Sequence, residues 1–390
     1  MACAALIIGK RFTKRSITMS KIKINSESLN RVINILGAAI PSNIITPSDG
    51  VFKFVIEGDK CHISAANAKC EITSFIKCES DEDIEFCVPH YVTSNTVKNF
   101  PEGDMQIDTE FNDELQYVTS IKIKPPGSRK KYKIACEGNP ERFPHWPEIE
   151  EEVLEEFVYK MGSFSEMIRA LAQNVDSQDP TNYYRDISFV TNEGKLKMIS
   201  GNSQTAASFD TDIDFSSNYI VPHEVAKYVA QLGEGDSKIT ITKSRISMES
   251  SGTKIKAKMV DMKPAGFMKI YKTEPEKKVI VSRDEMLKTL RRLSAFADEG
   301  NRVYMTCEGE ALTLKAHNKA GHEAEEDIEI VNQDGMRFEL IMNYAFLNRS
   351  ISIMKSENIM IKYNGESPIS FLRPDDPSNR QVWMLARYGS

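Results

Sequence analysis

The 390-residue chain lacks the marks of a membrane-spanning or a disulfide-stabilised protein. No apolar run approaches the roughly 20 residues that a membrane-spanning helix needs. The seven cysteines are odd in number and form no CxxC pair, which argues against a disulfide framework and fits a reducing compartment. Cys61, Cys70, Cys78 and Cys87 recur at intervals too long for paired zinc ligands, so we expect buried thiols there.

Catalytic motifs are also missing. The chain has no P-loop, no GxGxxG and no HExxH sequence, so the common nucleotide-binding and zinc-protease classes are not indicated. The acidic run at 150–156 is interpreted as a solvated linker and not as an acid–base pair. We therefore expect no enzymatic activity, no cofactor and no metal. A hydrolase that uses the acidic clusters is the competing hypothesis from another class.

Length and charge limit what remains. A chain of 390 residues is too long for one ordinary core and predicts two or three domains. A net charge of −6 argues against nucleic acid binding over the whole surface but leaves room for a local basic face. Residues 1–18 are basic and precede Met19, in the reverse order of a secretory signal. We interpret them as an N-terminal extension, with organelle targeting as the alternative.

One motif occurs twice. Residues 87–103 read CVPHYVTSNTVKNFPEG and residues 220–235 read IVPHEVAKYVAQLGEG, which places Pro89 and Pro222 133 residues apart. A period of this length indicates duplicated domains and not a solenoid of short repeats. Each proline suits the first turn of a helix, and Gly103 and Gly235 suit the turn that follows it.

Each copy is preceded by a short strand and an amphipathic helix. Apolar residues at i, i+3, i+4 and i+7 mark these helices, and the same layout appears a third time without the Val-Pro-His letters. The helix-marking residues are Leu29, Val32, Ile33 and Leu36; Phe164, Met167, Ile168 and Leu171; and Met286, Leu290, Leu293 and Ala297. A third, degenerate second helix begins near Met342. Alternating runs such as 61–65, 195–199 and 311–315 predict strands.

These patterns predict an α+β protein built from three repeats, each with two helices on antiparallel strands. The expected boundaries are an extension at 1–19 and domains at 20–148, 149–276 and 277–390.

The ordered residues resemble a known family. PERFPHWPEI at 140–149, SQDPTNYY at 177–184, KMVDMKPAGF at 258–267, LRRLSAFADEGNRV at 290–303 and the ending VWMLAR at 382–387 are similar to the bacterial sliding clamp, the beta subunit of DNA polymerase III. The resemblance runs from about Lys21 to Tyr388. It implies three clamp domains per chain, a head-to-tail homodimer, a six-domain ring and duplex DNA threaded through the ring.

Two oppositely charged segments suit such a dimer. Residues 128–135 read SRKKYKIA and residues 322–329 read HEAEEDIE, and both are expected to be edge strands. Opposite charges attract and prevent either edge from pairing with itself. A contact between the first and third repeats of two chains is head-to-tail and can close a ring. The predicted interface residues are Arg129, Lys131, Tyr132, Ile134, Ala295, Phe296, Glu323, Glu325 and Glu326. Two solvated charged strands are the alternative.

The helices carry the predicted DNA contacts. Their polar faces are net basic in a net acidic chain, as a cationic ring lumen requires. The predicted DNA-binding residues are Arg31, Lys98, Arg169, Lys227, Lys288, Arg291 and Arg349, with Gln178, Tyr183 and Tyr184 carried over from the resemblance. Tyrosines can stack on bases or bond phosphates. Packing of the tyrosines on their own sheet is the alternative.

The resemblance also implies a pocket for partner peptides. Its expected wall is Ser200, Thr205, Lys269, Ile270, Phe346, Val382, Met384 and Leu385. Thr205, and Arg185 after the tyrosine pair, stand where the family usually has leucine, which predicts a more polar pocket with altered peptide specificity.

The expected function is that of a processivity factor that encircles duplex DNA and tethers a polymerase. The expected partners are double-stranded DNA, a second copy of the chain, the DNA polymerase catalytic subunit, a clamp loader and ligase or repair proteins. The expected location is the cytoplasm of a bacterial or phage-infected cell. A clamp-fold scaffold that does not encircle DNA is the alternative.

Overall fold

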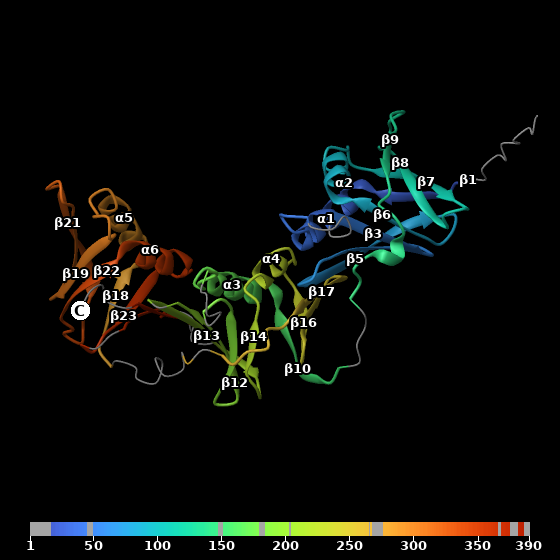
Figure 1. Ribbon diagram of the computed structural model, residues 1–390. Coiled ribbons are helices and arrows are strands. Elements are labelled where there is room, and N and C mark those ends of the chain that lie inside the picture. The colour runs from blue at the N-terminus through green and yellow to red at the C-terminus, as the bar shows by residue number, and fades with distance from the viewer. Residues whose placement is uncertain are drawn as a thin grey trace, which may run out of the picture. The chain divides into compact units, whose positions relative to one another are not determined.

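The computed structural model describes residues 17–390 except 45–49, 147–150, 179–183, 203, 265, 267–275, 366–367, 375–380 and 386–390. The chain divides into two compact units (Figure 1). Met1–Glu150 and Ser247–Ala257 form the first, and Glu151–Ile246 and Lys258–Ser390 form the second. The segment 247–257 therefore packs with residues far from it in the sequence.

The same order of ten elements occurs three times along the described chain: strand, helix, four strands, helix, three strands. The first copy follows the two-residue strand β1 (Ile17–Thr18) and consists of β2 (Lys21–Asn25), α1 (Ser26–Leu36), β3 (Val51–Glu57), β4 (Lys60–Ala66), β5 (Cys70–Ser80), β6 (Ile84–Pro89), α2 (His90–Val97), β7 (Asp104–Asn112), β8 (Tyr117–Lys124) and β9 (Tyr132–Ala135). The predicted α+β repeat is confirmed here.

The second copy consists of β10 (Val153–Lys160), α3 (Met161–Ala172), β11 (Ile187–Asn192), β12 (Lys195–Gly201), β13 (Thr205–Asp214), β14 (Tyr219–Val221), α4 (Val225–Val229), β15 (Asp236–Thr242), β16 (Arg245–Ser250) and β17 (Thr253–Lys258). The third consists of β18 (Lys278–Ser282), α5 (Arg283–Leu293), β19 (Arg302–Glu308), β20 (Ala311–His317), β21 (Glu323–Val331), β22 (Phe338–Asn343), α6 (Tyr344–Ile353), β23 (Asn358–Lys362), β24 (Ile369–Leu372) and β25 (Gln381–Leu385). The boundaries of three separate domains stay a prediction.

All strand pairs for which the register is known are antiparallel. In the first unit the order β17-β5-β2-β7-β8-β9 ends at β9, and β3 pairs with both β4 and β6. In the second unit the order is β14-β11-β12-β13-β25-β24-β23-β18-β21-β20-β19-β22. Strands of the second and third copies therefore join in one sheet, through pairing of β13 with β25.

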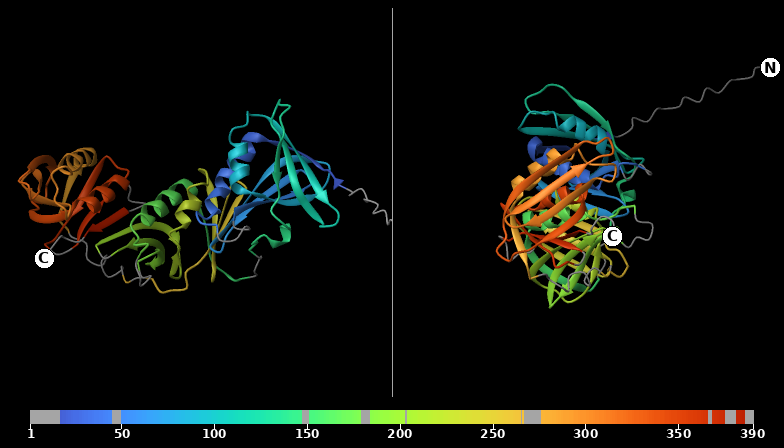
Figure 2. Two further views of the ribbon diagram at one scale, coloured as in Figure 1. Left: turned by 45° about the horizontal axis from the view of Figure 1, so that its top comes forward. Right: turned by 90° about the vertical axis from the view of Figure 1, so that its left-hand side faces the viewer.

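The two helices of each copy lie side by side against their strands (Figures 1 and 2). Leu29, Val32, Ile33 and Leu36 of α1 are all buried, which confirms the predicted apolar stripe. The corresponding stripe of α3 is also buried throughout. The Asn25 side chain caps α1 by accepting a hydrogen bond from the Ser28 N–H at 3.0 Å.

One backbone hydrogen bond recurs in all three copies. The first N–H of the first helix donates to a carbonyl in the turn after the second helix, from Ser26 to Gly103 at 2.9 Å and from Met161 to Gly235 at 2.7 Å. In the third copy Arg283 donates to Glu357 at 3.0 Å. The bond needs only a carbonyl, so Glu357 can stand where the other copies have glycine.

Several details differ from the expectations. Pro89 is the N-cap of α2 and the last residue of β6, and α4 begins three residues after Pro222 and spans only five residues. The helix α5 ends at Leu293, so Ala297 lies beyond it. The acidic run at 150–156 is not simply a linker, because β10 begins at Val153.

Buried thiols fill part of the first unit. Cys61, Cys70, Cys78 and Cys87 are all buried, as predicted. Burial raises the pKa of the Cys87 thiol to about 12, so it is protonated near neutral pH. No helix of the described residues is long and apolar enough to cross a membrane.

The carboxylate of Glu110 should make a pH-dependent contribution to stability. It binds Lys122, Lys133 and Ser120, which lower its pKa from 4.5 to about 2. A depressed folded-state pKa stabilises the fold above the unfolded value, and the effect is lost as the pH falls toward 2. Because Lys133 is exposed, we expect Glu110→Gln to lower the free energy of unfolding by about 1–2 kcal/mol at pH 7.

Urea unfolding at several pH values would measure this. The difference between Glu110→Gln and the parent chain should shrink between pH 4.5 and pH 2. Glu102→Gln, at an exposed position, is the control and should change stability by less than about 0.5 kcal/mol. A difference that stays constant with pH would contradict the assignment to the ionised carboxylate.

Candidate nucleic-acid interface and partner pocket

The cations of the predicted DNA surface lie on exposed helix positions. Arg31 is on α1 and Lys98 is the C-cap of α2, both in the first unit. In the second unit the exposed cations are Arg169 on α3, Lys227 on α4, Lys288 and Arg291 on α5, and Arg349 on α6. Since the apolar stripes of these helices face the strands, the cations occupy the outward face of each helix.

Some of these cations are already engaged within the chain. Lys288 pairs with Asp284 at 2.6 Å and, as the main cause, lowers the pKa of that carboxylate. Arg349 donates to the carbonyl of Gln173 at 3.1 Å and lies over the Phe346 ring. Both groups are exposed, so such contacts can exchange with solvent or phosphate at little cost.

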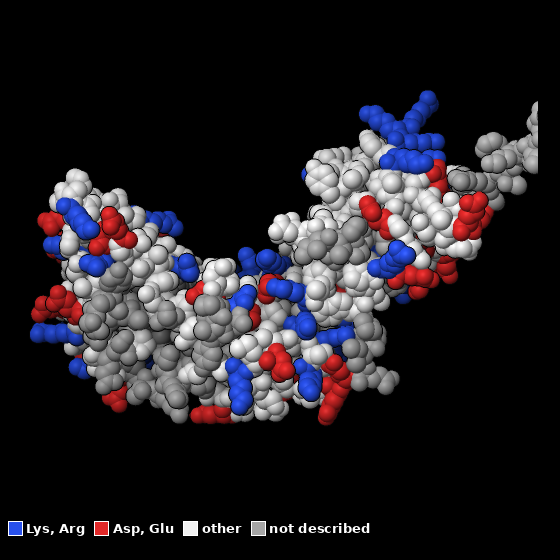
Figure 3. All heavy atoms as spheres, in the orientation of Figure 1, with Lys and Arg blue, Asp and Glu red and all other residues white. Residues whose placement is uncertain are grey.

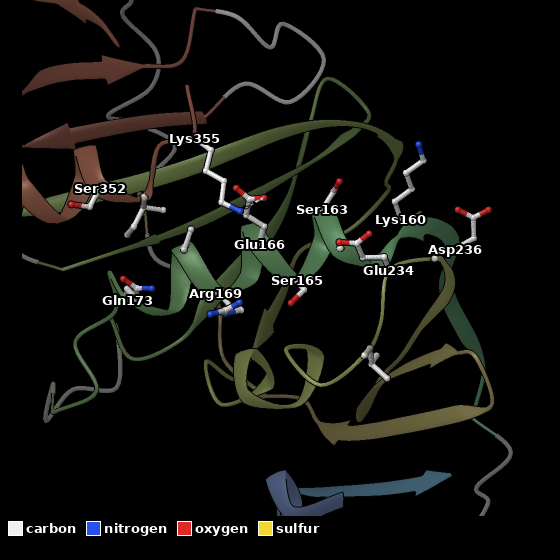
Figure 4. Close-up of a pocket in the computed structure, with 15 residues that line it drawn as sticks. Lys160, Ser163, Ser165, Glu166, Arg169, Gln173, Glu234, Asp236, Ser352 and Lys355 are labelled. Carbon is white, nitrogen blue, oxygen red and sulfur yellow. Dashed lines mark ion pairs between the residues drawn. The ribbon is translucent and has the colours of Figure 1, made fainter. Parts of the chain in front are cut away.

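A cavity of the second unit follows α3 and has a volume of about 710 Å³ (Figure 4). It is lined by Lys160, Arg169 and Lys355 together with Glu166, Glu234 and Asp236. Lys355 pairs with Glu166 at 3.2 Å. Because the three cations are balanced by three carboxylates, the cavity has no excess positive charge to bind an anion. We therefore do not interpret it as a phosphate site.

Gln178, Tyr183 and Tyr184 are the residues after α3 that are expected near DNA. Gln178 is exposed, and Tyr183 lies outside the described residues. Tyr184 is half-buried and packs on a cluster of Val190, Ile199, Ala206 and Leu372. The Tyr184 ring therefore contributes to the core, in agreement with the packing alternative for this residue.

Ser200 and Thr205 belong to a buried polar network. Ser200 is fully buried and donates its hydroxyl to the Leu171 carbonyl at 2.8 Å. Thr205 is 3% exposed and donates its hydroxyl to the Asn174 side chain. These two hydroxyls are satisfied inside the chain, so they do not make the expected pocket more polar.

Asn174 is the centre of this network and was not predicted from the sequence. It is 1% exposed, and its amide also donates to the Ser200 carbonyl at 3.2 Å. It thereby joins the end of α3 to the turn between β12 and β13. Its partners lie 26 and 31 residues away in sequence, so no local pattern indicates them.

The remaining pocket residues gather around the last strand. Val382, Met384 and Leu385 lie on β25, which pairs with β13 on one side and β24 on the other. Thr205 is directly opposite Leu385 in that pairing. Phe346 is half-buried on α6, a helix that contacts β25. Lys269 and Ile270 lie outside the described residues.

The two charged segments of the predicted dimer interface lie at strand edges. Among the described strands, β9 pairs with β8 alone, and Arg129 and Lys131 precede it in exposed positions. Lys and Arg side chains gather where Figure 1 labels β9 (Figure 3). Tyr132 is 40% exposed and packs beside Phe100, whereas Ile134 is 3% exposed and faces its own core.

The acidic edge is β21, which pairs with β20 along 323–329 and meets β18 only at Ile330 and Val331. Lys315 pairs with Glu323 at 3.7 Å and with Glu325 at 3.3 Å. Glu326 binds Arg292 and Thr289, and the Arg292 contact is the main cause that lowers the Glu326 pKa. Ala295 is exposed and Phe296 half-buried in the turn after α5.

Comparison with known proteins identifies relatives of this fold. Residues 268–387 match the family of the DNA polymerase III beta subunit, C-terminal domain. A beta sliding clamp of Chlamydia pneumoniae is 20% identical over 351 residues, which cover 87% of this chain and 92% of that protein.

Solved structures have a similar fold over at least 95% of this chain. A DNA polymerase sliding clamp of Pseudomonas aeruginosa has a TM-score of 0.83 at 16% identity, over 95% of this chain and 100% of that chain. A DNA polymerase III subunit beta of Borrelia burgdorferi, in complex with a natural product, has a TM-score of 0.83 at 16% identity, over 95% and 98%. A Pseudomonas aeruginosa clamp bound to griselimycin has the same TM-score at 17% identity, over 96% and 100%.

The Asn174 network should be important for stability. Replacement Asn174→Ala leaves the Thr205 hydroxyl and the Ser200 carbonyl without this partner in a buried place. We expect it to lower the free energy of unfolding by about 1–3 kcal/mol, measured by urea denaturation. Asn99→Ala removes an exposed side chain-to-backbone bond and should cost less than about 0.5 kcal/mol. Equal effects of the two substitutions would contradict a special role of Asn174.

Proposed function

We propose that this chain, a divergent member of the bacterial DNA sliding clamp family, is a processivity factor that encircles duplex DNA. The main support is the position of the exposed cations: α1, α3, α4, α5 and α6 each carry at least one, and Lys98 caps the end of α2. The chain also has the clamp fold over nearly its whole length. We assign it no catalytic role.

The proposed DNA contacts are weak and independent of sequence. Lys and Arg side chains on helix surfaces neutralise phosphates and release counterions, and such contacts exchange readily with salt. A ring that binds in this way can slide along the duplex. Retention then comes from topology, because leaving the DNA requires the opening of a protein interface. The proposed contacts are Arg31, Lys98, Arg169, Lys227, Lys288, Arg291 and Arg349, and the resemblance adds Gln178 and Tyr183 to this set.

The proposed ring closes through two identical joints between two chains. The edge of β9, preceded by Arg129 and Lys131, pairs with the acidic edge of β21 on a second chain. Tyr132, Ala295 and Phe296 supply the apolar part of the joint, and Ile134 supports β9 from beneath. Since each chain carries one edge of each kind, the contact is head-to-tail, and we propose that it closes with two copies.

The proposed partner site is the surface around β25 and α6. A polymerase catalytic subunit would dock a short peptide there against Phe346, Val382, Met384 and Leu385. The resemblance adds Lys269 and Ile270 to this proposed set. A clamp loader and ligase or repair proteins would use the same surface. The proposed place of action is the cytoplasm of a bacterial or phage-infected cell.

A loading assay on circular DNA tests the function directly. Purified protein is loaded on nicked circles with a clamp loader and ATP and then washed at high salt. We expect the protein to stay on the circle, because high salt removes phosphate contacts but not a topological link. Cutting the circle with a restriction enzyme should release it. Loss during the wash, before cutting, would favour a scaffold that does not encircle DNA.

The dimer joint is tested by charge reversal at β9. Arg129→Glu with Lys131→Glu should produce monomers in light scattering, because like charges placed face to face cost several kcal/mol. We expect the dimer to weaken more than about 100-fold.

A matched control and a rescue make this result specific. Lys21→Glu with Lys77→Glu reverses the same charge on exposed positions of β2 and β5, which β7 and β8 separate from β9, and should leave the dimer intact. Adding Glu323→Lys and Glu325→Lys to the β9 variant should restore dimers. A dimer unaffected by the first pair of substitutions would refute the joint.

A further inference from the structure

The second copy of the Val-Pro-His motif lies beside two carboxylates in the second unit. Asp186 immediately precedes β11, and His223 and Glu224 are the second and third residues after β14. The two strands are antiparallel neighbours with Ile187 opposite Val221, so the three side chains start from the same end of the strand pair. The proposed DNA and partner sites do not use this group.

The three side chains converge on a small, partly shielded volume. His223 Nδ1 is 3.0 Å from Asp186 Oδ1 and 3.5 Å from Glu224 Oε2. All three ligand atoms lie within 4.8 Å of one another. The exposed fractions of the side chains are 23% for His223, 17% for Asp186 and 20% for Glu224. The group is therefore sheltered but reachable from solvent.

These separations suit tetrahedral coordination. Ligand bonds of about 2.0–2.2 Å at a tetrahedral angle place neighbouring ligand atoms about 3.3–3.6 Å apart. The 3.5 Å distance from His223 Nδ1 to Glu224 lies in that range, and the 3.0 Å distance to Asp186 is slightly shorter. The 3.0 Å contact is a hydrogen bond between the imidazole and Asp186. An ion bound at Nδ1 would replace the hydrogen of that bond, and the neutral imidazole would then carry its proton on Nε2.

We propose that Asp186, His223 and Glu224 bind one divalent transition-metal ion with the ligand preferences of Zn²⁺. One imidazole nitrogen and two carboxylate oxygens are ligands that Zn²⁺ accepts, with a fourth position for water. The imidazole disfavours Ca²⁺ and Mg²⁺, which prefer oxygen ligands throughout. Two carboxylates also give the site the negative charge that a divalent cation needs.

A backbone contact orients one ligand in advance. The N–H of His223 donates to Asp186 Oδ1 at 2.9 Å, so the carboxylate is held in place by the same residue that supplies the imidazole. Ligands fixed by such outer contacts lose less freedom when an ion binds. A bound ion would join the segment before β11 to the turn before α4, and would stabilise the folded state by mass action.

The first copy of the motif provides a control inside the same chain. His90 corresponds to His223, but Tyr91 follows it where Glu224 follows His223. The His90 ring packs edge-on against the Phe52 ring, with 5.3 Å between the ring centroids, and burial lowers the pKa of His90. Within the described residues, only the second copy forms a group of three metal-ligating side chains.

Metal titration of the untagged full-length chain tests the proposal. The chain is stripped with a chelator, kept reduced and titrated with Co²⁺ by absorption spectroscopy and with Zn²⁺ by calorimetry. We expect one ion per chain and displacement of Co²⁺ by Zn²⁺. His223→Gln, Glu224→Gln and Asp186→Asn should each weaken binding at least about 10-fold. The asparagine still accepts the His223 N–H, so that variant keeps the local fold.

The control His90→Gln should bind the ion as the parent chain does, and circular dichroism should show that all variants are folded. Three outcomes would overturn the proposal: affinity weaker than about 1 mM, affinity unchanged in all three site variants, or an intense sulfur-to-cobalt charge-transfer band. The last result would place the ion at cysteine thiolates and not at this group.

Discussion

Each repeat is organised around one hydrogen bond, from the first N–H of its first helix to a carbonyl in the turn after its second helix. The first four N–H groups of a helix have no partner within the helix, so an outside acceptor is needed. The carbonyls of Gly103, Gly235 and Glu357 serve this purpose at 2.7–3.0 Å. The bond fixes the start of one helix against the end of the other. With the helix pair aligned, both apolar stripes can pack on the same strands.

That packing decides which face is left for function. When Leu29, Val32, Ile33 and Leu36 are buried, the other side of α1 must face outward, and Arg31 lies there. The same logic applies to the stripe of α3 and to Arg169. A chain with a net charge of −6 can thus present basic helix faces, because part of its negative charge lies elsewhere, as on β21. The position of charge and not its total is therefore what matters for binding DNA.

Local periodicity predicted the elements well, and long-range contacts explain most of what it missed. The strand at Lys21–Asn25 and the stripes of α1 and α3 follow from spacing alone. The short length of α4 cannot be predicted from spacing, because the apolar residues continue past the end of the helix. The network of Asn174 depends on residues in other strands, so no sequence window contains it. Ile134 is 3% exposed in the single chain, and its role at an interface stays a prediction.

The two Val-Pro-His segments show why so little sequence identity is enough to keep this fold. In both copies a strand ends near the proline and a helix follows it, yet His90 packs on Phe52 and His223 contacts Asp186. The backbone role of the motif is therefore separate from the chemistry of its histidine. The Pseudomonas aeruginosa clamp likewise shares the backbone fold, with a TM-score of 0.83, while only 16% of the residues are identical. Burial pattern and backbone bonds preserve the fold, and phosphate contacts need only a cation somewhere on the outward face. A peptide pocket needs particular shapes, so specificity for partners is where proteins that share this fold have most room to differ.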